Sequence, residues 1–512
     1  MNVRIGNRRA HRSAVRLLVA VAVTLGVAAA GLGTAGPDRR AEAATAWITL
    51  RFFDRTGDEL SAAQARSVIE CRNPRCTPGG RPGWANDALV DPDDLIVVKA
   101  KPLRERDGRL AFRVPSRPLA FVINWPTEPS GSSMLLVDNL GAGFGSPGTV
   151  NVTYRAALDA RARLATMLVA RPGYVPSAGF TAALAAADTH LAVAAGTSDE
   201  SVRGARGQLA LDRLAVAAER LLAEYGISYA RSVRTTRPPW LGVTLDTIDG
   251  TPGTLTQARA ITEPWGWVRL VFDRGVPPAA YAPAVTAAKA RGLRILGQPI
   301  DSSAAKRYTP AGYLARIQEY VTAFPEIDAW EVGNEVNGRW TGRDIAAKVA
   351  EAAAWVQAHS SALVVCTLYW QLGTDLPRAA TFNWLRDNLP PPVRADLDVV
   401  LLSTWVEDAP LGPLGFDPVM RALADELPGL RIGLGELGYW NDDTSRVWWA
   451  FDRTDPYGTA RRAVSSWYLA ASLGYPSSVG GGFWWYFVQE MQPPAGEPLA
   501  RTVADIRDAL AL

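Results

Sequence analysis

A strand-then-helix rhythm runs from residue 241 to the end of the chain, and it limits the folds that this sequence can adopt. Short apolar runs of strand type alternate with longer stretches whose apolar residues recur at helical spacing. Eight such units in about 270 residues is the count of a (β/α)8 barrel. An open doubly wound sheet is the alternative, but it would normally have fewer units, and no glycine-rich phosphate loop follows the first strand. The expected strands are Gly242–Leu245, Val268–Phe272, Leu293–Leu296, Ala329–Gly333, Leu363–Thr367, Val399–Ser403, Arg431–Leu434 and Gly482–Phe487.

The first half of the chain has a different pattern. Residues 46–155 alternate short β-rich runs with Pro and Gly turns, which indicates an antiparallel, β-sandwich-like domain. Residues 156–233 are rich in Ala, Leu and Arg at helical spacing, which is typical of two or three packed helices. The predicted fold class is therefore α/β, with a C-terminal (β/α)8 TIM barrel (234–512) preceded by the sandwich-like domain and the helical segment. The expected sandwich strands are Trp47–Phe53, Leu95–Ala100, Leu110–Val114, Leu119–Trp125, Met134–Val137 and Val150–Tyr154.

The first 45 residues have the pattern of a secretory signal peptide. Several arginines precede an apolar run, Leu17–Gly31, and Ala41-Glu42-Ala43 then offers a cleavage site between small residues. The run is short for a membrane-spanning helix, which needs about 20 apolar residues. We therefore expect a secreted, extracellular protein with no stable membrane insertion after signal removal. An uncleaved signal anchor is the alternative.

The net charge of +3 is small for 512 residues and argues against a nucleic-acid-binding protein, which would have a clustered basic face. We expect a monomer.

Cys71 and Cys76 have four residues between them in a Pro/Gly/Arg-rich loop. In an oxidising compartment this spacing favours a disulfide, and zinc is the weaker interpretation because no third and fourth ligand lie nearby. Cys366 falls in an apolar strand and is expected to be a buried free thiol.

Two of the expected barrel strands end in a carboxylate. Glu335 follows the fourth strand, in Ala329-Trp-Glu-Val-Gly-Asn-Glu335, and Glu436 ends the seventh. The carboxyl ends of barrel strands meet at one mouth, and the fourth and seventh strands face each other across it. The two carboxyl groups can therefore approach to about 5 Å, and such a pair is the minimal equipment for cleaving a glycosidic bond. The amide of Asn334 is placed to bind a sugar hydroxyl.

These residues give the barrel half, residues 240–512, a resemblance to glycoside hydrolase clan A, the retaining (β/α)8 glycosidases that include many cellulases, mannanases and xylanases. The resemblance lies in Trp330-Glu331-Val332-Gly333-Asn334-Glu335 and in Gly435-Glu436. It implies that Glu335 is the acid/base and Glu436 the nucleophile. The family within the clan stays open.

The resemblance extends to two more strands. Arg269, in Val268-Arg269-Leu270, resembles the strand-two Arg that supports the nucleophile, and the alternative is an ion pair that fills the barrel. Trp485 resembles the strand-eight Trp that floors the sugar site, and the alternative is a core residue. Glu331 lies in mid-strand and is interpreted as a structural ion-pair partner. Three other tryptophans follow strand ends and are candidates for either sugar stacking or the core: Trp370, Trp405 and Trp440.

The sequence also departs from the clan. Many members carry a His and a Tyr near the sixth strand end, but residues 402–407 contain neither, and the third strand ends in Gln298-Pro299 without a His. Asp246, Asp273 and Asp301 lie near other strand ends, but no metal-ligand spacing joins them. We expect neither a metal nor another cofactor.

The expected function is retaining hydrolysis of β-glycosidic bonds in a poly- or oligosaccharide. Glu436 would attack the anomeric carbon, and Glu335 would protonate the leaving oxygen and then activate water. One rival is a transglycosidase, which uses the same residues but a sugar acceptor. Another is a non-catalytic surface protein that binds glycan. A serine hydrolase is disfavoured because the nucleophile-elbow motif is missing.

Overall fold

The computed structural model describes residues 46–512 apart from 70–86, 248–251, 374–375, 407–408 and 440–455. The predicted signal peptide and three of the predicted functional residues, Cys71, Cys76 and Trp440, lie outside the described residues. Residues 46–512 belong to one compact unit.

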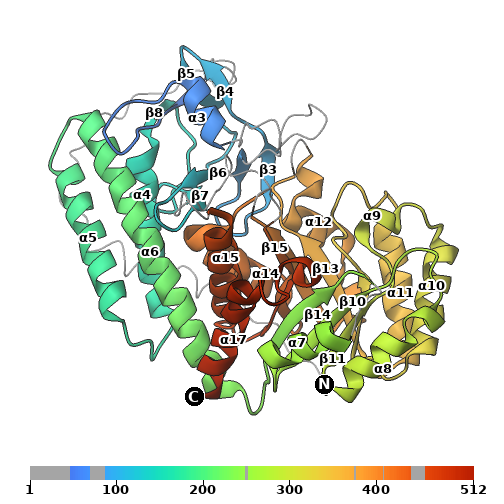
Figure 1. Ribbon diagram of the computed structural model, residues 1–512. Helices are drawn as coiled ribbons and strands as arrows, with labels where there is room; N and C mark the ends of the chain where they lie inside the picture. The colour runs from blue at the N-terminus through green and yellow to red at the C-terminus, as the bar shows by residue number, and fades with distance from the viewer. Residues whose placement is uncertain (1–45, 70–86, 248–251, 374–375, 407–408, 440–455) are drawn as a thin grey trace, which may run out of the picture. The chain divides into compact units, whose positions relative to one another are not determined.

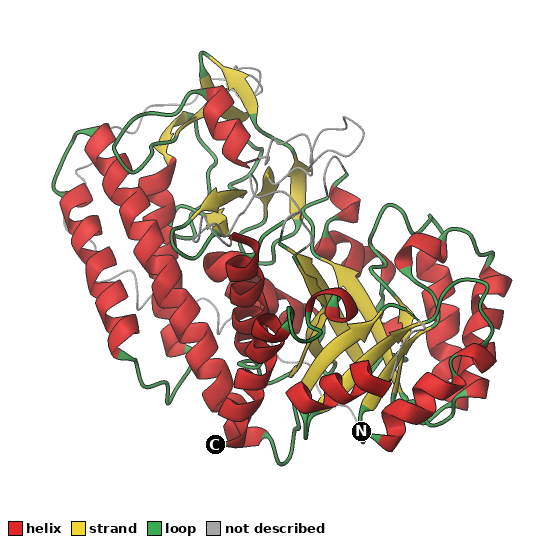
Figure 2. Cartoon of the chain, in the orientation of Figure 1, coloured by secondary structure: helices red, strands yellow, loops and turns green. Residues whose placement is uncertain are grey.

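Eight parallel strands form a closed barrel in the C-terminal part. They follow one another around the barrel in chain order, and the last strand pairs with the first. Figure 2 shows the barrel strands in yellow with helices around them. The predicted (β/α)8 barrel is confirmed, and each expected strand has its counterpart. The strands are β9 (Trp240–Leu245), β10 (Gly266–Val271), β11 (Arg294–Gln298), β12 (Ala329–Gly333), β13 (Leu363–Tyr369), β14 (Val399–Trp405), β15 (Arg431–Gly438) and β16 (Ser478–Trp484).

The inward-facing side chains of the barrel change from apolar to polar along the strands. At the amino ends, Trp240 and Trp267 stack with ring centroids 4.1 Å apart and fill the interior with Leu296 and Phe483. Because successive residues of a strand face opposite sides, Arg269 points inwards one layer nearer the carboxyl ends than Trp267. The apolar layer therefore fills the barrel at the amino ends of the strands, and a charged layer follows it towards the carboxyl ends.

Two barrel helices begin with a side-chain cap, at Asp301 and at Thr309. Thr309 caps α10, because its side chain accepts a hydrogen bond from Gly312 N and Pro310 occupies the first helical position. The α-helices of this part are α7 (Pro252–Thr262), α8 (Ala282–Ala290), α9 (Ser302–Ala305), α10 (Pro310–Ala323), α11 (Ile345–His359), α12 (Thr381–Asn388), α13 (Pro391–Arg394), α14 (Gly412–Glu426), α15 (Pro456–Ser472), α16 (Phe487–Glu490) and α17 (Glu497–Ala511), and two 3-10 turns are η1 (Pro278–Ala280) and η2 (Pro377–Ala379).

The N-terminal part contains two four-stranded sheets, with strand orders β4-β5-β1-β8 and β3-β2-β6-β7. The antiparallel prediction is wrong for one pair, because β1 and β8 run parallel. The expected strand Val150–Tyr154 is also wrong in its second half. Asn151 accepts a hydrogen bond from Tyr154 N and caps a helix that begins at Val152, so the cap prevails over β propensity. The elements are β1 (Trp47–Arg51), α3 (Ala62–Ile69), β2 (Asp87–Val90), β3 (Val97–Ala100), β4 (Arg104–Arg106), β5 (Arg109–Arg113), β6 (Ala120–Pro126), β7 (Ser132–Val137) and β8 (Gly148–Asn151).

Three long helices follow, as predicted: α4 (Val152–Val169), α5 (Ala178–Ala195) and α6 (Glu200–Val233). Figure 1 shows α6 beside α15 and α17 of the barrel part. Buried contacts join the two regions, since Arg171 pairs with Asp417 of α14. Trp467 of α15 also donates to the Glu219 carbonyl at 3.1 Å. Among the described helices, α5 alone has the length and apolarity of a membrane-spanning segment.

The sandwich-like part is joined to the barrel by a side chain of α12. The Asn383 amide accepts a hydrogen bond from Val97 N at 2.8 Å and donates to the Val97 carbonyl at 2.9 Å. This pairing mimics the backbone ladder of β3, and Arg386 adds an ion pair to Asp94 nearby. The N-terminal strands are thus anchored on a helix that follows β13.

Cys366 on β13 is fully buried and has no disulfide, as predicted. The predicted Cys71–Cys76 disulfide stays a prediction. Titration of the unreduced, denatured protein with a thiol reagent is expected to find one thiol, because only Cys366 would be free. Three thiols would contradict the bridge, and titration after reduction supplies the reference value of three.

Candidate active site

The barrel mouth brings together the two predicted catalytic carboxylates. Glu335 follows β12 and Glu436 lies on β15, and their exposed fractions are only 6% and 3%. Close packing surrounds both residues. A Cβ atom at Gly435 would lie 2.6 Å from the Thr367 methyl carbon, and one at Gly333 would lie 2.6 Å from Val336. A side chain at Gly333 or Gly435 would therefore collide with its neighbour, so glycine is the residue that fits at both positions.

Arg269 joins the nucleophile candidate to the charged layer of the barrel. Its Nη2 lies 2.9 Å from Glu436 Oε1, while Nε and Nη2 lie 2.7 and 3.0 Å from the two Glu331 oxygens. Both interpretations from the sequence thus hold together, because Arg269 contacts Glu436 and also forms a barrel-filling ion pair with Glu331. The guanidinium is fully buried. Burial by itself lowers the Arg269 pKa, but the charges of Glu331 and Glu436 outweigh it and raise the pKa above its usual value.

Asn334 orients Glu436 rather than standing free at the mouth. Its Nδ2 donates to Glu436 Oε1 at 2.9 Å and to Glu331 Oε1 at 3.3 Å. Its Oδ1 accepts from Ser302 N at 2.9 Å, at the start of α9. Glu436 Oε1 therefore receives hydrogen bonds from both Asn334 and Arg269. The expected contact between Asn334 and a sugar hydroxyl stays a prediction.

Glu335 is held in an uncommon backbone conformation. Its φ of +44° lies in the left-handed region, which a bulky side chain seldom adopts. Two hydrogen bonds hold its carboxyl group, one to each oxygen. Trp405 Nε1 donates to Oε1 at 3.1 Å, and Ser302 Oγ donates to Oε2 at 3.2 Å. Such strain at a residue with a fixed side chain is typical of a functional position.

The two carboxyl groups differ in their charge environment. Burial raises the pKa of Glu335 well above its usual value, and the Glu436 charge raises it further. Burial also raises the pKa of Glu436, but the Arg269 charge and the Asn334 amide oppose that rise. The surroundings thus favour the protonated form more strongly at Glu335 than at Glu436. This is the division between a nucleophile and a general acid.

Aromatic side chains lie around the pair. Trp405 meets Trp485 and Tyr486 edge to face at 6.3 and 5.9 Å between ring centroids. Trp485 lies 5.5 Å from the Arg269 guanidinium carbon and lines a pocket of about 300 Å3 together with Tyr308. Its predicted position at the floor of a sugar site stays a prediction, because neither Glu335 nor Glu436 lines this pocket. The polar residues of the lining are Asp246, Asp273, Arg274, Asp301, Ser303 and Arg307.

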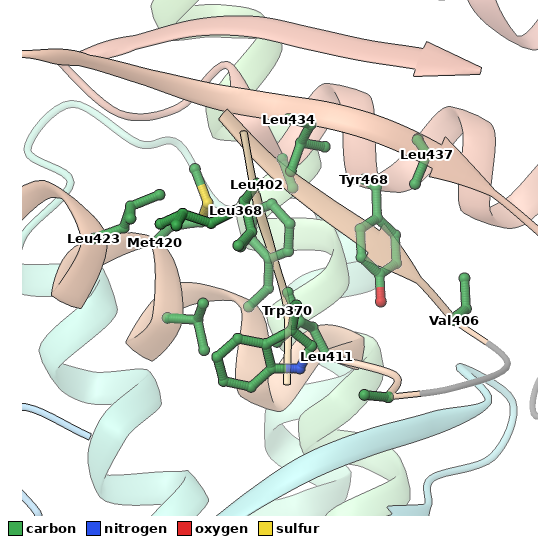
Figure 3. Close-up of a cluster of buried hydrophobic side chains, with 14 of the residues drawn as sticks. Leu368, Trp370, Leu402, Val406, Leu411, Met420, Leu423, Leu434, Leu437 and Tyr468 are labelled. Carbon is green, nitrogen blue, oxygen red and sulfur yellow. The ribbon is translucent and has the colours of Figure 1, made fainter. Parts of the chain in front are cut away.

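The candidate sugar-stacking residues separate into different environments. Trp405 contacts Glu335 as a hydrogen-bond donor, a role that the sequence did not suggest. Trp370 is buried among Leu402, Leu411 and other apolar residues, as Figure 3 shows, and meets Phe382 edge to face. Apolar side chains cover its ring, which favours the core interpretation of Trp370 over sugar stacking. Trp440 lies outside the described residues.

Sequence reasoning missed three contacts around the carboxylates. Ser302 bonds to Glu335, Trp340 Nε1 donates to Ser302 Oγ at 2.9 Å, and Ser403 Oγ accepts from Glu436 N at 3.3 Å. Ser302 begins α9 and Trp340 lies in a turn after β12, and no motif marks either residue. Ser403 lies two residues after Leu401 on β14, and residues two apart on a strand point to the same side. Because Leu401 belongs to the interior cluster, the inward direction of Ser403 could have been predicted. Among the described residues, no group of three or more His, Cys, Asp or Glu side chains could hold a metal ion.

Comparison with known proteins finds similarity only at the level of solved structures. No protein-family model matches the chain, and no curated protein does. The chain is similar to a GH113 β-1,4-mannanase, with 12% identity and a TM-score of 0.38 over 53% of this chain and 99% of that one. It is similar to a GH5-4 broad-specificity endoglucanase from Clostridium acetobutylicum, with 10% identity and a TM-score of 0.34 over 54% and 99%. It is also similar to GH5_18 from Streptomyces cattleya in complex with GlcNAc, with 15% identity and a TM-score of 0.36 over 54% and 81%.

Proposed function

We propose that this protein is a retaining β-glycosidase that hydrolyses O-glycosidic bonds in a poly- or oligosaccharide. The observation that carries the proposal is the unequal environment of two buried carboxylates at one barrel mouth. Glu436 receives hydrogen bonds from Arg269 and Asn334, which favour its ionised form. Glu335 lacks a cationic partner within ion-pair distance in the described part of the chain, and its pKa is raised. One group can thus attack while the other supplies a proton.

The linkage of the pair supports double displacement. Asn334, next to Glu335 in the chain, donates to Glu436, and the Glu436 charge raises the Glu335 pKa, so we expect the two carboxyl groups to lie about 5 Å apart. An inverting enzyme leaves roughly 6.5–9.5 Å between them for a water molecule, whereas a retaining enzyme brings them to about 5 Å. In the proposed reaction Glu436 attacks the anomeric carbon, and Glu335 donates its proton to the leaving oxygen. Glu335 then accepts a proton from the water that attacks the glycosyl-enzyme.

Two alternatives use the same site. A transglycosidase would pass the glycosyl group to a sugar instead of water, and a non-catalytic surface protein would only bind glycan. The proposed location is extracellular, on the basis of the signal-peptide pattern in residues 1–45.

The test is a panel of aryl β-glycosides and polysaccharides incubated with the exported protein, with products followed by chromatography. Cleavage with a β-configured first product supports the proposal, and elongated products identify a transglycosidase. Binding without cleavage of any substrate would leave the glycan-binding alternative, and an α-configured first product from a β-glycoside would exclude retention.

A pH dependence follows from the direction of the Glu335 pKa. The general acid must be protonated, and burial and the Glu436 charge raise its pKa. Activity on substrates with a poor leaving group is therefore expected to persist above pH 4.5, the ordinary Glu value, and to fall as pH rises through the Glu335 pKa. Activity should also fall at low pH as Glu436 becomes protonated. The measurement is kcat/KM against pH, in which these limbs report the free enzyme.

A further inference from the structure

We propose that Ser302 is a positioning residue whose hydroxyl group changes between donor and acceptor as Glu335 changes protonation state. Ser302 is the first residue of α9, and only 6% of its surface is exposed. Its Oγ donates to Glu335 Oε2 at 3.2 Å and accepts from Trp340 Nε1 at 2.9 Å. This inference rests on the proposed function, in which Glu335 acts first as an acid and then as a base.

The argument begins with the hydrogen-bonding capacity of each neighbour. An indole N–H can only donate, so Trp405 can satisfy Glu335 Oε1 but cannot accept a proton from it. A hydroxyl group has one proton and two lone pairs. One lone pair of Ser302 Oγ accepts from Trp340. The proton and the other lone pair remain for Glu335, so Ser302 can donate to the carboxylate and accept from the carboxylic acid.

Hydrogen bonds to two neighbouring residues fix the position of the Ser302 hydroxyl. Ser302 N donates to Asn334 Oδ1, and Asn334 in turn donates to Glu436. Asp301 caps α9 through Ser303 N, which holds the start of the helix in place. Ser302 therefore lies between the residue that orients the nucleophile and the residue that carries the proton.

The proton balance shows what this arrangement does. In the first step the Glu335 proton leaves its hydrogen bond with Ser302 Oγ and goes to the leaving oxygen, and the Ser302 hydroxyl then turns and donates to the new carboxylate. In the second step Glu335 takes a proton from water, and the Ser302 oxygen can again accept. The hydroxyl proton stays on Ser302 throughout, so no other group is consumed. Both states of Glu335 keep a partner at Oε2 without movement of the backbone.

The main test measures the Glu335 pKa without substrate. Protein labelled with 13C at the Glu carboxyl carbon is titrated by NMR, and E335Q assigns the resonance. A hydrogen bond to an ionised carboxylate is roughly twice as strong as a neutral one. S302A therefore removes more from the ionised form, and the Glu335 pKa should rise by about 0.5–1 unit. S360A is the control, because the Ser360 Oγ accepts from Ala362 N after the end of α11 and bonds to neither carboxylate, and it should leave the pKa unchanged.

A second variant covers the case in which S302A does not fold. W340F keeps an aromatic ring but removes the donor to Ser302 Oγ, which weakens the Ser302 hydroxyl as a donor. The Glu335 pKa should then rise in the same direction by a smaller amount. A Glu335 pKa in S302A, or in W340F if S302A is unfolded, that equals the S360A value or falls below it would overturn the proposal.

Kinetics supply a separate readout. The basic limb of kcat/KM in S302A should move to higher pH by the amount that NMR measures, and S302T, which keeps the hydroxyl, should move it back. A purely structural role would lower the rate without moving the limb. If the wild-type protein cleaves no glycoside, the proposed function fails, whereas the NMR titration still decides the role of Ser302.

Discussion

Glu436→Ala is expected to lower glycoside hydrolysis by roughly a millionfold, the scale seen when the nucleophile of a covalent mechanism is removed. The truncated side chain leaves space on the face of the sugar from which Glu436 would attack. Azide can enter that space and displace an activated leaving group in one inversion, so a β-glycoside substrate should give the α-glycosyl azide. NMR of the product identifies the anomer.

Glu335→Ala should give the opposite anomer. A substrate with a good leaving group still forms the glycosyl-enzyme on Glu436, and azide then intercepts it from the other face. Two inversions give the β-glycosyl azide. With a poor leaving group, this variant should lose roughly 10²–10⁴-fold in rate, the usual contribution of general acid catalysis.

The pair of variants assigns each carboxylate its role. Reversed anomers would exchange the roles of Glu335 and Glu436, and near wild-type activity in either variant would mean that the residue is not catalytic. Glu319→Ala is the control, because Glu319 is an exposed carboxylate on α10 of the same barrel. It should keep wild-type activity and give no azide product.

Arg269→Leu is expected to destabilise the fold as well as to inactivate the site. The substitution leaves Glu331 and Glu436 buried without their cation, and removal of one partner from a buried ion pair costs about 3–5 kcal/mol. Urea denaturation measures the loss in the free energy of unfolding. Arg259→Leu is the matched control, because Arg259 also pairs with a glutamate, Glu263, but on the exposed face of α7. It should have little effect.

The pH dependence of the Arg269→Leu deficit provides a check on its cause. Burial raises the pKa of Glu436 in the folded state, and without Arg269 the charge that opposes this rise is lost. The protonated form of Glu436 then favours folding, so stability relative to wild type should improve as pH falls through its folded-state pKa. A deficit of equal size at low and neutral pH would instead indicate a packing defect.

Much of this architecture was available from local sequence patterns. Period and length were enough to predict eight strands and the intervening helices, since each barrel unit is a short local repeat. The common location of Asn334, Glu335 and Glu436 follows from the rule that the carboxyl ends of barrel strands meet at one mouth. The mid-strand position of Glu331 likewise indicated an ion pair, and the structure identifies its partner as Arg269.

Contacts between distant loops depended on the tertiary structure. Trp370 and Trp405 both follow strand ends and are equivalent as sequence signals, yet Trp370 packs in the core while Trp405 bonds to Glu335. No local pattern separates them, because the difference depends on which other strands lie opposite. The parallel β1–β8 pair is decided in the same way, by partners about 100 residues apart in the chain. The sequence by itself determined the two carboxylates and the strands that carry them. Only the tertiary structure decided the surroundings of Glu335, because Ser302 and Trp405 bond to Glu335, and Trp340 bonds to Ser302, through side-chain geometry rather than through neighbouring positions in the chain.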